Sequence, residues 1–177
     1  MNSFRKYAPW IVGLAMAAFI IPSTIGSLFK GDDNSKPSVI QPAQPYEPPF
    51  RMDGTLWAIK DSDTTAIFRT EYATTPEAIE IGMMYRRSMD KDMAMLFFMS
   101  GGDQLRSFWM KNTIVPLDII YINSANEVVS IQANAQPLSM ESLPSSQPAS
   151  FVLEIYGGEA AAQGISIGTK VYWSDKK

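Results

Sequence analysis

Short apolar runs, separated by polar clusters and glycines, make up the chain from residue 51 onward. Apolar and polar positions alternate over residues 64–72, which is the two-residue period of a strand with one buried face. Residues 93–99 are almost continuously apolar, as a buried strand is, and the largely apolar residues 117–123 predict another strand. The pattern predicts further strands over residues 55–61, 106–112, 127–135, 149–157 and 169–173.

Two segments have the pattern of short helices. Residues 74–86 begin at a favourable N-cap, Thr75, and their apolar side chains recur at helical spacing. Gly82 lies inside this segment, where we expect it to allow a close approach of the backbone to the sheet. A second helix is predicted over residues 157–165, ending at Gly164. Many short strands with two short helices predict a mainly β fold, a single antiparallel β-sandwich or barrel.

The first 30 residues differ from the rest and predict a signal or anchor segment. Arg5 and Lys6 precede an uncharged stretch over residues 7–29, and positive charges before an apolar stretch hold that end in the cytoplasm. As an anchor, the stretch is long enough to cross a hydrocarbon layer of roughly 30 Å. As a cleavable signal, its densest part, residues 10–21, has a suitable length. Both alternatives predict an extracytoplasmic protein, in the periplasm or at the cell surface, that is membrane-anchored or secreted.

Residues 31–50 predict a linker between this segment and the folded part. Five prolines occur within these twenty residues, too many for a helix or an inner strand. Such a stretch is typical of an extended, semi-stiff tether. We therefore expect one β domain over residues 51–177, held at a distance from the membrane when the N-terminal segment serves as an anchor.

Composition excludes several kinds of chemistry. The 177 residues include no histidine and no cysteine, so neither a catalytic triad nor a His- or thiolate-based metal site can form. The net charge of −3 and the absence of a basic stripe argue against nucleic-acid binding. Methionine thioethers can bind Cu(I), but Met93, Met95 and Met99 share one strand phase, as core residues do. We predict no metal and no cofactor.

One apolar segment carries a distinctive motif. Phe108-Trp109-Met110-Lys111-Asn112-Thr113, followed by Pro116-Leu117-Asp118-Ile119, resembles the uncharacterised family called domain of unknown function 192. Gly82-Met83-Met84 and Val152-Leu153-Glu154 extend the resemblance, which covers about residues 65–173. The family usually has Gly-Leu-Met in place of Gly82-Met83-Met84, a mild difference that conserves volume. The resemblance implies a β-dominated fold of jelly-roll-like or barrel type, often behind an export signal, and it implies no activity.

Several charged and aromatic residues lie within or beside the apolar segments. Charged side chains are rarely buried unless they are paired, so we expect these residues to form one partly buried polar cluster. The candidate residues are Arg86, Trp109, Lys111, Asp118, Glu154 and Tyr156.

The cluster has three interpretations. It can be a binding cleft, in which Arg86 and Lys111 hold an anionic ligand beside aromatic rings. It can be the acid–base pair of a hydrolase or lyase, with Asp118, Glu154 and Lys111. It can also be a salt-bridge network that fixes strand register.

Our leading hypothesis for function is an exported cell-envelope domain that binds a ligand or a partner and is not an enzyme. The alternatives are the hydrolase or lyase and a structural subunit of an envelope assembly.

Overall fold

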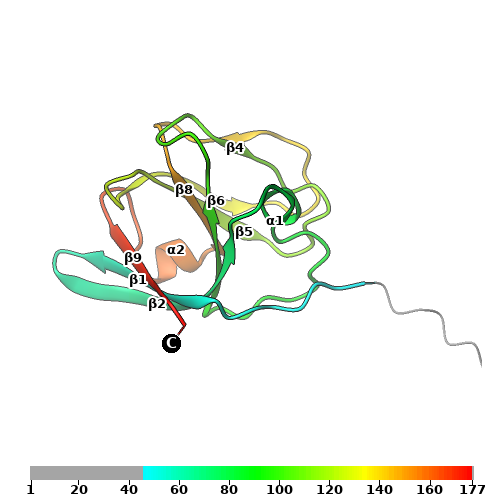
Figure 1. Cartoon of the computed structure of the whole chain (residues 1–177), viewed down its shortest axis with the longest axis horizontal. Coiled ribbons are helices and arrows are strands. Elements are labelled where there is room, and N and C mark those ends of the chain that lie inside the picture. The colour runs from blue at the N-terminus through cyan, green and yellow to red at the C-terminus, as the bar shows by residue number, and fades with distance from the viewer. Residues whose placement is uncertain (1–45, 177) are drawn as a thin grey trace, which may run out of the picture. The chain divides into compact units, whose positions relative to one another are not determined.

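The computed structural model describes residues 46–176, which form a mainly β domain with two short helices (Figure 1). Seven strands form one large sheet in the order β6-β5-β8-β3-β2-β1-β9, and two form a small sheet, β4-β7. The large sheet contains β1 (Gly54–Lys60), β2 (Asp63–Ala73), β3 (Met93–Phe98), β5 (Leu117–Ile122), β6 (Val128–Ala135), β8 (Phe151–Tyr156) and β9 (Lys170–Asp175). The other elements are β4 (Ser107–Phe108), β7 (Leu143–Pro144), α1 (Pro76–Ile81) and α2 (Glu159–Ala162). The prediction of a mainly β fold with two short helices is confirmed.

The predicted antiparallel sandwich or barrel of jelly-roll type is not what the large sheet forms. β2 and β3 are parallel, and the other neighbouring pairs are antiparallel. A parallel pair needs a crossover connection, which the segment containing α1 provides between these two strands. The edge strands β6 and β9 meet beside an isolated bridge, Glu127–Lys170, rather than along a ladder, so this mixed sheet is not a closed barrel.

Three predicted elements are shorter than the sequence suggests. The second helix, predicted over residues 157–165, is limited to Glu159–Ala162. Thr75 caps α1 as predicted, because its hydroxyl accepts a hydrogen bond from a backbone N–H of the first turn at 3.2 Å. The helix does not extend over residues 74–86, because Gly82 has a φ of 48° and ends it. The predicted strand over residues 106–112 is also limited to the two residues of β4, and the chain turns directly after it.

Apolar side chains pack on both faces of the large sheet. An inner layer draws residues from all seven strands and includes Ala160 of α2. In Figure 1, α2 accordingly lies between the β1–β9 side and the β5–β8 side of the sheet. An outer layer lies beneath α1 and the long loops, with Met95, Phe97 and Ile119 among its buried members. Strands β3, β5 and β8 are therefore buried on both faces, which explains their nearly continuous apolar sequences.

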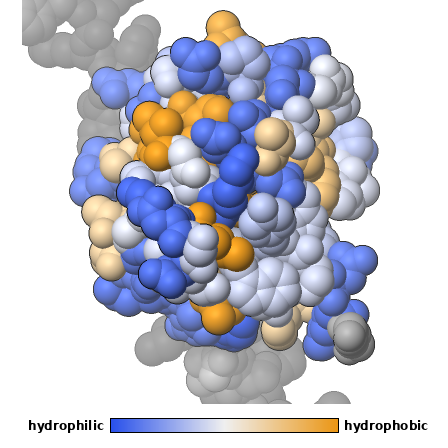
Figure 2. Space-filling view, turned by 90° about the vertical axis from the view of Figure 1, so that its left-hand side faces the viewer, coloured by the Kyte–Doolittle hydropathy of each residue, from blue (hydrophilic) through white to orange (hydrophobic). Residues whose placement is uncertain are grey.

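Figure 2 shows the surface on one side of the molecule. On the side that carries the β1–β2 hairpin, hydrophilic residues cover much of the surface, and apolar residues show in small groups between them (Figure 2). Within residues 46–176, no helix has the length and apolar character needed to cross a membrane. The predicted signal or anchor segment, residues 1–30, lies outside the described residues, as does most of the predicted linker.

Asp118 joins three elements through one carboxylate. It is completely buried in β5 and faces the inner layer, like its strand neighbours Ile120 and Ile122. Its Oδ1 accepts hydrogen bonds from the backbone N–H groups of Asn134 at 2.6 Å and Gly158 at 3.0 Å. Its Oδ2 accepts one from an N–H in α2, that of Ala160, at 2.7 Å. Three charge-assisted bonds thus satisfy a buried charge and hold β6 and α2 against β5.

We expect Asp118→Asn to lower the free energy of unfolding by about 1.5–3 kcal/mol, because the amide turns a donor toward at least one of these N–H groups. Urea denaturation measures the change. Glu141→Gln, at an exposed loop position, is the matched control and should stay within about 0.5 kcal/mol of wild type. An Asp118→Asn protein as stable as the control would show that the three hydrogen bonds do not hold these elements together.

Candidate functional site

A row of side chains crosses the outer face of the large sheet beneath α1. Strand register places Glu71 of β2 beside Met95 of β3, Met95 beside Glu154 of β8, and Glu154 beside Ile119 of β5. Two carboxyl groups therefore flank a methionine in a layer that is otherwise apolar. Glu71 is 3% exposed and Glu154 is 4% exposed, so each needs a partner or must lose its charge.

Glu71 meets two arginines. Arg86, only 5% exposed, donates from Nη2 to Oε2 of Glu71 at 2.8 Å. Nη1 of Arg51 lies 3.3 Å from Oε1 of the same carboxylate, and the Arg51 backbone N–H donates to Oε2 at 3.2 Å. The Arg51 side chain also pairs with Asp53 and donates to the Tyr72 carbonyl oxygen. Both oxygens of Glu71 are therefore engaged with donors, which offsets the cost of burying its charge.

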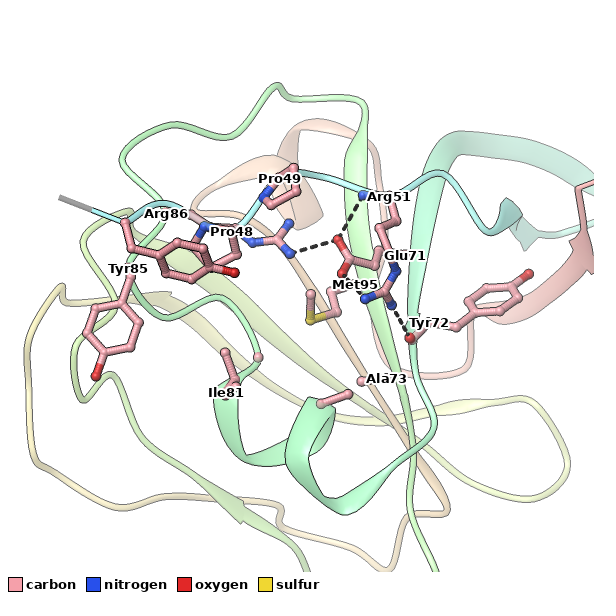
Figure 3. Close-up of a pocket in the computed structure, with 13 residues that line it drawn as sticks. Pro48, Pro49, Arg51, Glu71, Tyr72, Ala73, Ile81, Tyr85, Arg86 and Met95 are labelled. Atoms are coloured by element: carbon pink, nitrogen blue, oxygen red, sulfur yellow. Dashed lines mark hydrogen bonds and ion pairs between the residues drawn. The ribbon is translucent and has the colours of Figure 1, made fainter. Parts of the chain in front are cut away.

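A pocket of about 380 Å³ opens beside this ion pair (Figure 3). One wall is the strap, which we define as residues 46–51; it overlaps the end of the predicted linker. The opposite wall is α1 and the turn after it, including Ala78, Ile81 and Tyr85. Apolar groups dominate the walls, and the charged part of the lining is Glu71 with its two arginine partners, Arg86 and Arg51. We call this the strap pocket; it combines apolar walls with a few polar groups, as small-molecule sites do.

Glu154 lies deeper than the strap pocket and has no hydrogen-bond partner for Oε2 among the described residues. Burial raises its pKa to about 8, while the positive charge of Arg86 acts in the opposite direction. Tyr121 is on the same face, but its hydroxyl donates to the Leu143 carbonyl oxygen instead. Glu154 is therefore a neutral carboxylic acid at pH 7.

The backbone above Glu154 approaches closely because residue 82 is a glycine. A Cβ added at Gly82 would lie 3.1 Å from the Phe97 ring and 3.8 Å from Oε2 of Glu154. This is the close approach to the sheet that the sequence predicted. A hollow of about 30 Å³, lined by Gly82, Trp109 and Glu154 among others, separates the helix from the sheet. It is large enough for about one water molecule.

The loop that follows β4 and carries the family motif is hydrogen-bonded to the turn after α1, which lies above Glu154. Tyr85 has a φ of 65° and Asn112 a φ of 54°, both rare for residues other than glycine. The Tyr85 backbone N–H donates to the Asn112 carbonyl oxygen at 2.9 Å, and Nδ2 of Asn112 donates to the Tyr85 hydroxyl at 2.9 Å. Such unfavourable conformations persist where surrounding contacts determine them, and they are often found at functional sites.

A second, more open pocket of about 460 Å³ lies on the other side of α1. Its lining is mainly apolar and includes Ile79, Phe108, Trp109 and Met140. The ammonium group of Lys111 lies 5.0 Å from the centre of the Trp109 ring, within cation–π range. Trp109 also lines the hollow above Glu154, so it separates the second pocket from the buried acid.

The structure brings together only part of the predicted polar cluster. Arg86 and Glu154 are neighbours, and Trp109 lines the same hollow as Glu154. Asp118 faces the inner layer and Glu154 the outer one, so the sheet separates the two carboxyl groups. The proposed acid–base pair therefore has no common site.

Two other members of the predicted cluster lie apart from the acid. Lys111 is in the turn after β4 and forms no ion pair within the described part of the chain. Tyr156 follows Glu154 along β8 and packs against the outer layer, but it lines neither the strap pocket nor the hollow.

Sequence reasoning did not identify Glu71 or Arg51 as parts of the site. The alternation in β2 places Glu71 on the face of Ile67 and Arg69, which are not buried, so it looked like a solvent-facing residue. The residue that could have indicated burial is Ala73, which follows Glu71 on the same face of β2 and is buried in the outer layer. A face that becomes apolar toward the end of a strand indicates that something covers it there.

The methionines serve mainly as packing residues. Met83, Met89 and Met95 are buried members of the outer layer, and Met93 and Met99 pack against it. Among residues 46–176, no group of three acidic side chains is arranged to hold a metal ion.

Glu154 predicts a specific dependence of stability on pH. The unfolded chain releases this proton near pH 4.5 and the folded chain near pH 8, so the folded state binds more protons between these values. Its contribution to the free energy of unfolding should therefore fall by up to roughly 1.4 kcal/mol per pH unit as pH rises through this window. Glu154→Gln removes this dependence.

Urea denaturation of the wild-type and Glu154→Gln proteins at pH 5, 6.5 and 8 measures the effect as the difference between their free energies of unfolding. The contributions of other titrating groups cancel in this difference. Relative to wild type, the Glu154→Gln protein should gain stability as pH rises, while the exposed Glu141→Gln control should show a flat difference. A flat difference for Glu154→Gln as well would mean that the folded chain does not hold the Glu154 proton.

Comparison with known proteins places the chain in a family. The model for domain of unknown function 192, described as "Uncharacterized ACR", matches residues 58–173. A solved structure of a Novosphingobium aromaticivorans protein of unknown function is 37% identical, with a TM-score of 0.64, over 67% of this chain and 84% of that one. A Sinorhizobium meliloti protein, provisionally described as a transcription regulator, is 34% identical, with a TM-score of 0.65, over 68% of this chain and 93% of that one. No curated protein matches. The chain belongs to the uncharacterised family of domain of unknown function 192.

Proposed function

We propose that this protein is an exported cell-envelope domain that binds a small ligand in the strap pocket and does not catalyse a reaction. The observation that carries the proposal is the composition of that pocket. Its walls are apolar, and its charged lining is Glu71 with Arg51 and Arg86, of which the buried Arg86 uses one of its five N–H donors for Glu71. Buried donors without partners are costly, and a ligand that accepts hydrogen bonds relieves that cost.

The geometry favours binding over acid–base catalysis. A general acid and base must both reach the reacting atoms, and Asp118 lies on the opposite face of the sheet from Glu154. Glu154 has a shifted pKa, but the hollow above it holds only about 30 Å³. A substrate that fills the strap pocket would meet Arg86 and Glu71, which already neutralise each other.

The proposed location follows from the N-terminal sequence. Positive residues before an apolar stretch, followed by a proline-rich tether, are typical of a domain held outside the cytoplasm. The strap overlaps the end of that tether, so the binding site would be near the membrane-proximal end of the domain. The regulatory role ascribed to the Sinorhizobium meliloti protein is not carried over, because this chain has a net charge of −3.

Filling the pocket should remove a bound compound. Ile81 is 46% exposed and lines the strap pocket, so Ile81→Trp occupies its volume without replacing a core residue. We expect a small molecule to co-purify with the wild-type protein under native conditions and to be lost from this variant, as measured by mass spectrometry of extracts. Ile67→Trp, at a 57% exposed position outside the pocket, is the matched control and should retain it. Equal amounts in both variants would exclude the strap pocket as its site.

The absence of cysteine allows a direct test of location. A single cysteine at the exposed position of Glu141→Cys would be the only thiol in the chain. We expect a membrane-impermeant maleimide to label it in intact cells whose outer membrane, where present, is permeabilised. The same protein with Arg5→Glu and Lys6→Glu should label more weakly, because these charges orient the segment. Labelling that requires lysis of the cells would place the domain in the cytoplasm and contradict export.

A further inference from the structure

The strap pocket offers a ligand hydrogen-bond donors and almost no free acceptor. Oε2 of Glu71 is taken by Arg86 and by the Arg51 backbone, and Oε1 faces the Arg51 guanidinium. A cationic ligand group would have to displace one of these arginines. Asp53, which also pairs with Arg51, does not line the pocket, and it additionally accepts the Tyr72 backbone N–H.

Arg86 is the donor with unused capacity. Among the described residues its only hydrogen bond goes to Glu71, and its Nε is buried without a partner. The residue is 5% exposed and lines the strap pocket, and its buried Nε has lost water without receiving a replacement partner. The group that best completes a guanidinium is a planar carboxylate, which accepts two parallel N–H bonds.

No unpaired negative charge opposes an anion at this position. Among the described residues, Glu71 is the only carboxyl group that lines the strap pocket, and Glu154 lies behind Gly82, where burial keeps it protonated at neutral pH. The strap adds Pro48 and Pro49, which carry no charge, and the helix adds Ala78 and Ile81. An anion would therefore meet the Arg86 guanidinium, the already paired Glu71 carboxylate and apolar walls.

We infer that the strap pocket binds a small organic carboxylate, with its carboxylate group at Arg86 and its apolar part against Ile81 and Met95. This rests on the proposed binding function and specifies its ligand. A monoanionic carboxylate fits better than a phosphate group, because a dianion would need more than the single under-used guanidinium. The volume of about 380 Å³ suits a compound with one aromatic ring or a short chain.

Matched probes test the inference on the full-length chain. We would compare 3-phenylpropanoate with its amide and with 3-phenylpropylamine, titrating each under ligand-observed NMR. The carboxylate should bind roughly 10- to 100-fold more tightly than the amide, because a charge-assisted hydrogen bond replaces a neutral one. Acetyl-Ala-Phe and its C-terminal amide form a second pair, which distinguishes a peptide end from a free acid as the source of the carboxylate. A preference of 10-fold or more for either acid over its own amide supports the inference.

Substitutions of Ile81 locate the binding without replacing either member of the buried ion pair, and a substitution of Arg86 tests its planar fork. Ile81→Glu places a negative charge beside the ligand and should weaken carboxylate binding roughly fivefold or more relative to Ile81→Gln, while amide binding stays the same in the two variants. Arg86→Lys, which retains the charge but loses the planar fork, should lose most of the preference for the acid.

Failure takes two distinguishable forms. If acid, amide and amine bind equally, or if Ile81→Glu and Ile81→Gln bind the acid equally, the carboxylate inference is overturned, and loss of the co-purified compound from the Ile81→Trp protein would still support the strap pocket as a ligand site. If none of the probes binds and no compound is lost from the Ile81→Trp protein, both the inference and the proposed function are overturned.

Discussion

The burial of β3, β5 and β8 on both faces is the constraint on which the rest of the structure depends. A carboxyl group in these strands, or beside them, has no solvent to face, so each must be neutralised in some way. Asp118 receives hydrogen bonds from three backbone N–H groups. Glu71 pairs with two arginines. Glu154 receives neither, and burial keeps it protonated.

These three solutions have different consequences. Asp118 joins β5, β6 and α2 through its three hydrogen bonds, and both of its oxygens are already engaged, so it offers no free acceptor to a ligand. The pairing of Glu71 completes the carboxylate but not Arg86. Glu154 has no hydrogen-bond partner for Oε2 among the described residues. The buried polar atoms without hydrogen-bond partners, Nε of Arg86 and Oε2 of Glu154, therefore both lie on the outer face. This difference between the two faces is why we place function on the outer one.

The two faces also differ in how they are covered. The inner layer is closed by the sheet itself, which draws on all seven strands and encloses part of α2. The outer layer is covered by separate pieces: a six-residue helix with no buried residue, the strap, and the loop that carries the family motif. Separate pieces do not pack as continuously as strands do, and the pockets lie on either side of α1.

The local features of the fold could be predicted from the sequence, but the pairing of strands could not. The continuous apolar run identified β3 as a buried strand, and the cap at Thr75 and the close approach at Gly82 follow from local chemistry. Strand phase correctly placed Asp118 with Ile120 and Glu154 with Val152. It could not relate the two strands, because register decides which face of one strand adjoins which face of the next.

The parallel pairing was out of reach of the sequence for a related reason. A helix between two strands is compatible with several topologies, and here it brings β3 alongside β2. That pairing places Glu71 next to Met95 and close to Arg86, an ion pair fifteen residues apart in sequence. Neither partner carries a local pattern that names the other.

The family motif can now be assigned a physical role. Phe108, Trp109 and Thr113 line the hollow above Glu154, and Asn112 fastens the turn that follows α1. Asp118, in the same motif, acts on the other face of the sheet. One continuous segment thus covers part of the outer layer and also supplies Asp118, which holds β6 and α2 against β5 on the inner face. A segment bound to two layers at once tolerates few alternatives at each position, which accounts for a specific sequence without requiring that any of its residues be catalytic.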